Sequence, residues 1–298
     1  MRILITGSNG LLGQKLVKLC EKNQLTYLAT SKGENRNPNC PLQKYVSMDI
    51  TNPLEINKIF DSFYPTHLIH TAAITNVDYC EINPQECIES NVTASHYLFE
   101  TCKRFHTHFN LLSTDFVFDG KNGPYKEEDE VNPLSVYAQS KVSAENLVLQ
   151  SSYTNWAITR TIIVYGQAFN YSRSNIVLWV YNSLKNQKTI NVVNDQYRMP
   201  TWAEDLAWAC LELAKKSSKG IFHVSGEEFL SMYELAVKIA QFYHLDLNLL
   251  KECDSKSLNQ PALRPPKTGF ILDKIKKEIA YKPTPLKDTL GMFNFEKY

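Results

Sequence analysis

The feature that most restricts the fold of this chain is a run of three glycines near its start. Gly7, Gly10 and Gly13 follow a short apolar run and precede a segment whose apolar residues recur at helical spacing. In such a strand–turn–helix, the glycines permit a tight turn, the approach of a pyrophosphate and close helix–strand packing. The amides at the helix start also favour a bound phosphate. The spacing differs from Gly-x-Gly-x-x-Gly, and a glycine turn can serve the fold alone, but this position predicts a dinucleotide-binding turn.

Strand-like apolar runs alternate with helical patterns over the first half of the chain. This alternation is typical of a parallel sheet covered by helices on both faces, so the sequence predicts an α/β fold with a Rossmann-type, doubly wound parallel sheet. The expected strands are residues 2–6, 25–30, 44–47, 67–71, 109–113 and 156–161. The expected helices are residues 11–22, 53–62, 84–104 and 135–150.

The rhythm of the sequence changes after about residue 165. The expected elements are then a helix at 174–186, a strand pair around 189–193, a helix near 202–215, a strand at 220–224, a helix at 231–243 and a proline-rich tail from residue 260. We expect these pieces not to extend the sheet but to form a smaller lobe across the carboxyl ends of its strands, where such sheets bind ligands. The predicted division is a nucleotide-binding domain at 1–165, to which some later segments return, and a mainly substrate-binding lobe at 166–298.

Charge and cysteine usage restrict the class of protein. The net charge is only +1, from 32 basic and 31 acidic residues, so the sequence gives no electrostatic reason to expect a nucleic-acid or membrane partner. Seven cysteines without a C-x-x-C pair fit poorly with a disulfide framework. The apolar run at the start is too short for a signal-peptide core, and no run of about 18 apolar residues occurs. We therefore expect a reduced, cytoplasmic protein that binds a small molecule.

A second motif lies in the helix expected at 135–150. Tyr137 and Lys141 are four residues apart, so both lie on one helix face, where an ammonium group would lower the pKa of a phenol and ease proton transfer. Thr114 follows the strand expected at 109–113, and its hydroxyl could hold a substrate oxygen whose charge changes. Each pattern alone also fits a solvated helix face or a turn cap. Together with the glycine turn, they predict redox chemistry with a nicotinamide cofactor.

The choice of cofactor depends on the segment after the second expected strand. An acidic residue there would bind the ribose of NAD, whereas a basic neighbour accommodates the 2′-phosphate of NADP. Thr30 and Ser31 occupy the place of the acid, and Lys32 and Arg36 follow. This pattern favours NADPH over NADH, although Lys32 and Arg36 also fit solvated loop charges.

These motifs resemble those of the extended short-chain dehydrogenase/reductases, and within them the dTDP-4-dehydrorhamnose reductase family. The resemblance covers most of the chain. It includes the glycine turn, the Tyr-x-x-x-Lys pair and the segments 72–78, 113–120, 160–165, 194–201 and 264–265. The Asp-Gln…Pro-Thr segment within 194–201 is the most specific of these. Two positions differ from the family pattern: Phe116 replaces a frequent Tyr, and Ile163 stands where some relatives present a Trp to the sugar.

The resemblance implies a role for particular residues. Thr114, Tyr137 and Lys141 would be catalytic, with Tyr137 as the general acid and Lys141 also binding the cofactor ribose. The cofactor would lie along Gly7, Asn9, Gly10, Leu11, Leu12, Gly13, Asp49, Ile50, Ala72 and Ala73. The sugar nucleotide would be faced by Thr75, Asn175 and Arg198. Asp195 and Gln196 fit a structural turn before Pro200 as well as a binding role.

The implied activity is reduction of the C4 keto group of dTDP-4-dehydrorhamnose to give dTDP-L-rhamnose. The same triad fits a nucleotide-sugar C4 epimerase, whereas a dehydratase would need an acid at position 116, where Phe116 cannot take a proton. A non-catalytic, NADP-binding regulatory subunit like the β subunit of methionine adenosyltransferase is the alternative from another class. Some relatives use Mg²⁺, but the sequence shows no built-in metal site, and relatives commonly form homodimers.

Overall fold

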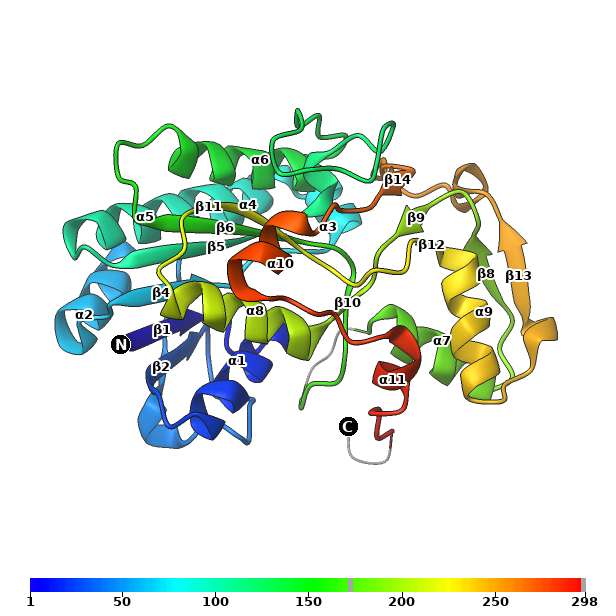
Figure 1. Ribbon diagram of the computed structural model, residues 1–298, viewed down its shortest axis with the longest axis horizontal. Helices are drawn as coiled ribbons and strands as arrows, with labels where there is room; N and C mark the ends of the chain where they lie inside the picture. Colours follow the sequence, from blue (N-terminus) through cyan, green and yellow to red (C-terminus); the bar gives the residue numbers. More distant parts are fainter. Residues whose placement is uncertain (171–173, 296–298) are drawn as a thin grey trace.

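A seven-stranded parallel sheet forms the centre of the molecule, as the computed structural model shows for residues 1–170 and 174–295 (Figure 1). The strand order is β11-β6-β5-β4-β1-β2-β3, a doubly wound arrangement that confirms the predicted fold class. The bounds of these strands are β1 Arg2–Thr6, β2 Thr26–Ser31, β3 Tyr45–Ser47, β4 His67–His70, β5 His108–Thr114, β6 Trp156–Thr161 and β11 Gly220–Val224.

Helices cover both faces of the sheet. Their bounds in the first part of the chain are α1 Leu11–Lys22, α2 Pro53–Phe63, α3 Val77–Ile82, α4 Pro84–Ile88, α5 Ala94–Arg104 and α6 Val136–Leu149. Alternate residues of β1 face opposite layers, because Ile3 and Ile5 pack in the core beneath α1 while Leu4 packs in the core beneath α2 and α5. A strand buried on both faces in this way needs the continuous apolar run that the sequence shows.

The single long helix predicted at 84–104 is interrupted. Helix α4 passes through a π-helical segment, Glu89–Thr93, before α5 begins. Asn91 in this segment is buried and bonds the backbone of Ile74 with both ends of its amide, so the irregular turn serves a contact with the loop after β4. A hydrophobic pattern does not distinguish such a π-helical turn from a regular helix.

The later half of the chain builds a smaller lobe with its own apolar core, seen to the right of the sheet in Figure 1. Its helices and strands are β7 Val164–Tyr165, α7 Ile176–Lys185, β8 Ile190–Val193, β9 Tyr197–Arg198, β10 Thr201–Trp202, β12 Leu230–Ser231, α9 Met232–Phe242, β13 Leu250–Cys253, β14 Lys267–Thr268 and α11 Leu286–Leu290. The expected strand pair around 189–193 is wrong, because β8 pairs in parallel with β13, far along the chain.

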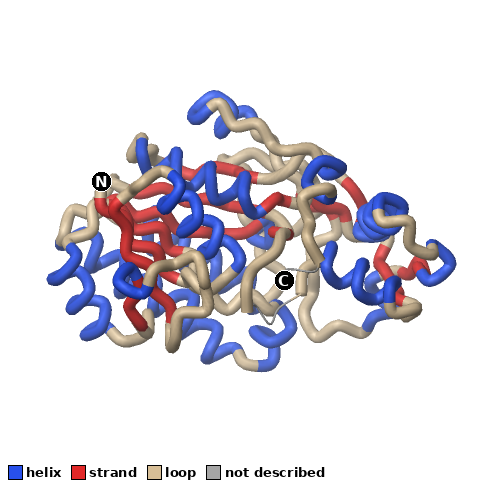
Figure 2. Tube along the Cα trace, turned by 90° about the horizontal axis from the view of Figure 1, so that it is seen from below, coloured by secondary structure: helices blue, strands red, loops and turns tan. Residues whose placement is uncertain are grey.

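Three later segments return to the sheet. Strand β11 pairs in parallel with β6, and helix α8 (Ala203–Lys215) packs beside α1 on one face of the sheet, so the expectation that later pieces do not extend the sheet is wrong for β11. Helix α10 (Asp273–Ile279) then packs against β11 and α8. Figure 2 shows the strands of the central sheet gathered at one side and the lobe, with short strands of its own, at the other. The boundary at residue 165 stays a prediction.

Candidate active site

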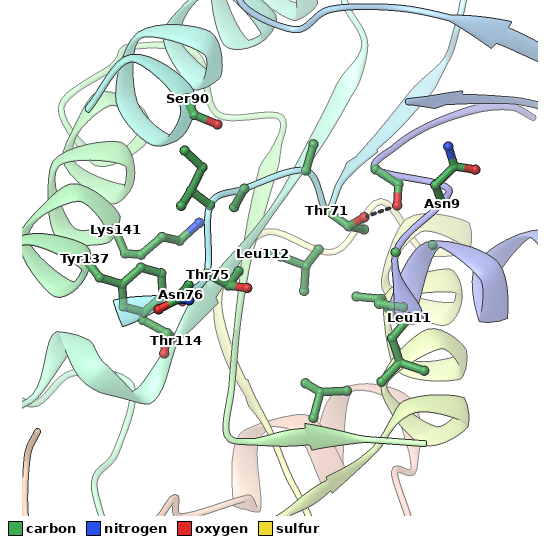
Figure 3. Close-up of a pocket in the computed structure, with 18 of the residues that line it drawn as sticks. Asn9, Leu11, Thr71, Thr75, Asn76, Ser90, Leu112, Thr114, Tyr137 and Lys141 are labelled. Carbon is green, nitrogen blue, oxygen red and sulfur yellow. Dashed lines mark hydrogen bonds between the residues drawn. The ribbon is translucent and has the colours of Figure 1, made fainter. Parts of the chain in front are cut away.

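A cavity of about 1280 Å³ lies at the carboxyl ends of the central strands, bordered by the lobe (Figure 3). Its walls come from the glycine turn, the loops after β2, β3 and β4, the end of β5, helix α6 and the start of α7. The volume exceeds the range of about 300–1,000 Å³ usual for one small ligand. The space therefore suits two ligands side by side at the edge where doubly wound sheets bind them.

The glycine turn forms one end of this cavity. Gly7 has a φ of +71°, which a residue with a side chain rarely adopts, and a Cβ on Gly13 would lie 2.3 Å from the Gly7 carbonyl oxygen. These facts confirm that Gly7 makes the turn and that Gly13 allows helix α1 to pack on the turn. Gly10 caps α1, and the first amides of this helix lack intrahelical acceptors. The cavity wall here has the backbone donors that a pyrophosphate needs.

Asn9 connects the glycine turn to the loop after β2. Its backbone amide donates to Ser31 Oγ at 3.0 Å, its side-chain oxygen accepts from the Arg36 amide at 2.8 Å, and its side-chain nitrogen donates to the Glu34 carbonyl at 2.8 Å. The Asn9 side chain thus fixes the shape of the loop. Its predicted contact with the cofactor remains a proposal.

The two basic residues of this loop differ in their partners. The Lys32 ammonium lies 2.7 Å from an Asp49 carboxylate oxygen, whereas the Arg36 guanidinium makes no hydrogen bond or ion pair within the described parts of the chain. Both residues line the cavity. Arg36 is therefore the cation better able to meet an added phosphate group.

Thr30, predicted to contact the cofactor, does not line the cavity. Its side chain is buried in the sheet and donates to the Ile5 carbonyl oxygen at 3.1 Å. The next residue, Ser31, does reach the cavity wall. The sequence placed both residues at the strand end but did not indicate that Thr30 belongs to the sheet interior.

Tyr137, Lys141 and Thr114 come together at the other end of the cavity. Ser135 caps α6 by accepting from the Ala138 amide, and this start places Tyr137 and Lys141 one helical turn apart on the same face. Figure 3 shows both side chains directed to the end of the cavity that also holds Thr75, Asn76 and Thr114. All three predicted catalytic side chains are less than one-tenth exposed.

Burial controls the protonation of this pair. It raises the pKa of Tyr137 well above that of a free phenol, opposed by a hydrogen bond with Thr114 and reinforced by the nearby Asp115. It lowers the pKa of Lys141 to about 8, opposed by Glu145. The predicted net lowering of the Tyr137 pKa is wrong here, because desolvation of the phenolate dominates. At neutral pH Tyr137 is a protonated phenol, the form that donates a proton.

Thr114 both caps a turn and faces the cavity. Its hydroxyl accepts from the Phe116 amide at 3.2 Å and donates to Asp115 Oδ1 at 3.1 Å, which starts the one-turn 3₁₀ helix Asp115–Val117. Next to it, Ser113 lines the same cavity, and its buried hydroxyl has no partner within the described residues. The strand end thus offers two hydroxyl groups at the cavity wall.

The residues predicted to face the sugar nucleotide divide into two groups. Thr75 and Asn175 line the cavity, and Asn175 also caps α7 while donating to the Gly166 carbonyl oxygen at 2.7 Å. Arg198 does not line it, because its side chain is 2% exposed and is directed to Asp115 and backbone carbonyls. Asp195 accepts from the amide and hydroxyl of Ser255, which fits the structural alternative for this residue.

The cavity also contains residues that the sequence did not single out. They lie in the loop after β4, in or beside α4, in the π-helical segment and in β5. They include Thr71, Asn76, Glu86, Glu89, Ser90 and Leu112. Asn76 caps α3, so its position before a short helical pattern was a usable signal. Glu89 and Ser90 lie in the π-helical segment, which no sequence pattern indicated.

Two other properties concern only the described residues, 1–170 and 174–295. No group of three or more His, Cys, Asp or Glu side chains is arranged to hold a metal ion. No helix in these ranges is both long and apolar enough to cross a membrane.

Comparison with known proteins gives a family match over nearly the whole chain. Residues 1–295 match the model of the RmlD substrate binding domain. A dTDP-4-dehydrorhamnose reductase from Aggregatibacter actinomycetemcomitans is 33% identical over 296 residues, which cover 95% of each chain. The β subunit of methionine adenosyltransferase 2 from Bos taurus is 32% identical over 255 residues, which cover 84% of this chain and 74% of that protein.

A solved structure shows that the fold, too, is similar to that of a dTDP-4-dehydrorhamnose reductase. The dTDP-4-dehydrorhamnose reductase from Bacillus anthracis, determined in complex with NADP, superposes with a TM-score of 0.85. It is 25% identical in sequence, and the match covers 99% of each chain. The sheet and the lobe described above are thus shared by a protein whose structure contains a dinucleotide.

Proposed function

The chain belongs to the RmlD substrate binding domain family, an extended short-chain dehydrogenase/reductase fold, and we propose that it is a nicotinamide-dependent reductase of a nucleotide-linked 4-keto-6-deoxy sugar. dTDP-4-dehydrorhamnose is the substrate suggested by its relatives, with dTDP-L-rhamnose as the product. The observation that carries the proposal is the meeting of Tyr137, Thr114 and Lys141 at one end of a cavity that also contains the glycine turn.

The cavity fits a dinucleotide cofactor. The backbone of Gly10, Leu11, Leu12 and Gly13 would hold the pyrophosphate, because a side chain at Gly13 would clash with the turn and the helix start presents free amides. Asp49 and Ile50 would border the adenine, and Ala72 and Ala73 the ribose. Arg36, Lys32 and Ser31 line the wall where a 2′-phosphate would lie, which favours NADPH over NADH. When bound, a reduced nicotinamide supplies the hydride.

The side chains at the other end would handle the proton. As the C4 carbonyl oxygen gains negative charge, Tyr137 Oη donates its proton to that oxygen, so the carbonyl becomes a hydroxyl. The Thr114 hydroxyl would turn its proton from Asp115 Oδ1 to the same oxygen and hold that oxygen by a hydrogen bond. The Lys141 ammonium lies one turn away and stabilises the phenolate that forms. Tyr137 then regains a proton from solvent.

The direct test is the loss of NADPH absorbance when purified protein is mixed with dTDP-4-dehydrorhamnose. We expect turnover by the natural sequence, and a loss of about 10²–10⁴-fold for Tyr137→Phe with NADPH binding retained. Unchanged turnover in the Tyr137→Phe protein would refute the role of the phenol. No oxidation with a panel of 4-keto nucleotide sugars would refute the reductase proposal.

A regulatory role is the second candidate, because the similarity extends to the β subunit of methionine adenosyltransferase 2. In that case the protein would hold its nucleotide without turnover, since a retained triad does not prove catalysis. Copurification with a partner enzyme, together with no oxidation of NADPH by any sugar in the panel, would favour it. An epimerase would instead retain tightly bound NAD through purification, whereas a reductase must release its oxidised cofactor.

Three further properties remain predictions. A homodimer would be detected by light scattering of the purified protein. A requirement for Mg²⁺ would appear as loss of turnover with a chelator. A cytoplasmic location would be checked by cell fractionation.

A further inference from the structure

Arg198 lies directly behind the turn that carries Thr114. It comes from β9 in the lobe, is buried, and places its Nε 3.6 Å from Oδ2 of Asp115, the residue directly after β5. The Arg198 guanidinium also donates to the carbonyl oxygens of Tyr197, Pro265 and Pro266. Its donors are therefore used by protein groups on both sides of the lobe boundary, and none is directed into the cavity.

One branch of this network leads to Thr114. The same carboxylate that faces Arg198 accepts the Thr114 hydroxyl on its other oxygen, at 3.1 Å. Thr268 of β14 donates to the oxygen that faces Arg198. Asp115 is thus held from the lobe side by two groups, and it in turn fixes the position of the Thr114 side chain, whose hydroxyl proton must turn from Asp115 to reach the substrate oxygen.

A second branch leads to Tyr137. The Arg198 guanidinium carbon lies 5.3 Å from the centre of the Phe116 ring, and Phe116 packs edge-on against Tyr137 with ring centres 6.1 Å apart. Phe116 also donates its amide to the Thr114 hydroxyl. The positions of Thr114 and Tyr137, the two residues proposed to bind the substrate oxygen, therefore both depend on the guanidinium of Arg198.

A buried ion pair is a costly way to stabilise a fold. Apolar residues of similar volume often give equal or greater stability, because two charges must lose their water. An arginine with a rigid fork of donors does, however, fix several partners in one geometry. The buried pair of Arg198 and Asp115 therefore indicates that the relative positions of the partners of Arg198 matter more here than the stability that the pair adds.

We propose that Arg198 is a positioning residue that acts through Asp115 and Phe116, so that the Thr114 hydroxyl and the Tyr137 phenol meet one substrate oxygen. The inference rests on the proposed reductase function. It replaces the predicted contact between Arg198 and the sugar nucleotide. Arg198 belongs to the lobe. The lobe must therefore pack correctly against the sheet for the proposed proton donor, Tyr137, to be held in place.

Steady-state kinetics of the full chain with NADPH and dTDP-4-dehydrorhamnose test this role. In Arg198→Met, kcat should fall about 10–100-fold, the loss expected when reacting groups shift by about 1 Å, with KM for NADPH and for the sugar within about twofold of the natural sequence. Arg198→Lys keeps the charge and should recover part of kcat. A sugar KM raised with kcat unchanged would overturn the proposal and restore direct binding.

The matched control is Arg264→Met. Arg264 is an arginine of the same region and forms an ion pair with Asp78 at 2.7 Å, but among the described residues it makes no hydrogen bond, ion pair or ring contact with Asp115 or Phe116. Its kcat should stay within about twofold of the natural value. A loss equal to that of Arg198→Met would show that any ion-paired arginine in this region matters, and the positioning role would fail.

The pH profile separates positioning from simple stability. The groups facing Asp115 are Arg198 from β9, Thr268 from β14, Thr114 beside it and Tyr137 from α6. Burial raises the pKa of Asp115 and Arg198 opposes the rise, so loss of Arg198 should move the acidic limb of kcat to higher pH. Asp115→Asn should remove this limb, and Asp115→Asn combined with Arg198→Met should cost no more than the worse single change. An unmoved limb and fully additive losses would contradict the inference.

A readout without turnover keeps the two proposals apart. If the natural sequence oxidises no NADPH, the reductase proposal fails, and crystal structures with NADPH decide the positioning role. A displaced Thr114 hydroxyl or Phe116 ring in Arg198→Met or Arg198→Lys, but not in Arg264→Met, would support it. Unchanged positions in all variants would overturn it.

Discussion

The protonation state of single buried side chains decides what this cavity can do. Tyr137 and Lys141 are adjacent on one helix face, yet burial acts on them in opposite senses, keeping the phenol protonated and making the ammonium easier to deprotonate. Both would act in their neutral-pH forms, a phenol and an ammonium. The pH range in which these forms coexist has an upper limit set by Lys141.

Activity should therefore decline in alkaline solution. The pKa of Lys141 is lowered to about 8, so the ammonium is lost as the pH rises through that value, and kcat/KM, which reports the free enzyme, should fall with an apparent pKa near 8. An arginine in place of Lys141 keeps its charge at high pH, so the Lys141→Arg protein should not show the alkaline decline of kcat/KM, even if its activity is lower. A natural protein whose kcat/KM is flat to pH 10 would contradict the expectation.

Selection of the cofactor should depend on one cation. Arg36 lacks an ion-pair partner in the described chain, whereas Lys32 is already paired with Asp49. Arg36→Ala should raise KM for NADPH at least about tenfold and leave KM for NADH unchanged, since a hydrogen bond to a charged group contributes about 1.5–3 kcal/mol. Lys32→Ala is the control with the smaller effect. Equal changes for both cofactors would exclude a 2′-phosphate contact.

At the scale of helices and strands, local patterns were informative and long-range pairing was not. Helix α1 occupies residues 11–22 as predicted, because its apolar spacing and its glycine cap lie within one short segment. The pairing of β8 with β13 and of β11 with β6 joins segments far apart in sequence, and no local signal reports such contacts. The same limit explains Arg198, whose sequence neighbours suggested a ligand while its partners come from β5 and the proline-rich tail.

The packing of α1 on the glycine turn gives a prediction for Gly13. Gly13→Ala would place a methyl group 2.3 Å from the Gly7 carbonyl oxygen, where only backbone can yield, so the free energy of unfolding should fall by about 3 kcal/mol and NADPH binding should weaken. Gly33→Ala is a suitable control, because its added carbon meets no atom within 4 Å and only its positive φ resists the change. Both quantities can be measured by denaturant unfolding and fluorescence titration. Full stability and binding in Gly13→Ala would contradict the close packing.

At the scale of the whole molecule, several histidines are enclosed in neutral form. His70 bonds Thr6 and Ser95 through its two ring nitrogens and is 2% exposed, and burial lowers its pKa to about 3. Burial likewise lowers the pKa of His67 to about 4 and the pKa values of His108 and His223 below the usual range. These histidines lie on strands of the sheet and bond residues far from them in the sequence, so their titration is a property of the assembled fold.

The protein should consequently lose stability in mild acid. Because the unfolded chain binds protons near pH 6.5 and the folded histidines do not, this contribution is complete above pH 6.5 and decreases as the pH falls toward 4. His70 alone should cost about 2 kcal/mol at pH 5. Thermal unfolding across this range should show a steep decline that His70→Asn reduces and that His96→Gln, an exposed control, does not. A melting temperature constant from pH 7 to pH 5 would contradict it.

The late return of β11 to the sheet has a consequence for synthesis on the ribosome. Strand β6 ends at Thr161, but its outer neighbour begins only at Gly220, after much of the lobe has been made. At about 5–20 residues per second, the hydrogen-bonding groups along that border would wait about 3–12 s for their partner. A nascent chain of this kind offers other polypeptides a template during those seconds, so its yield in cells should depend on translation speed and on chaperones that shield newly made strands.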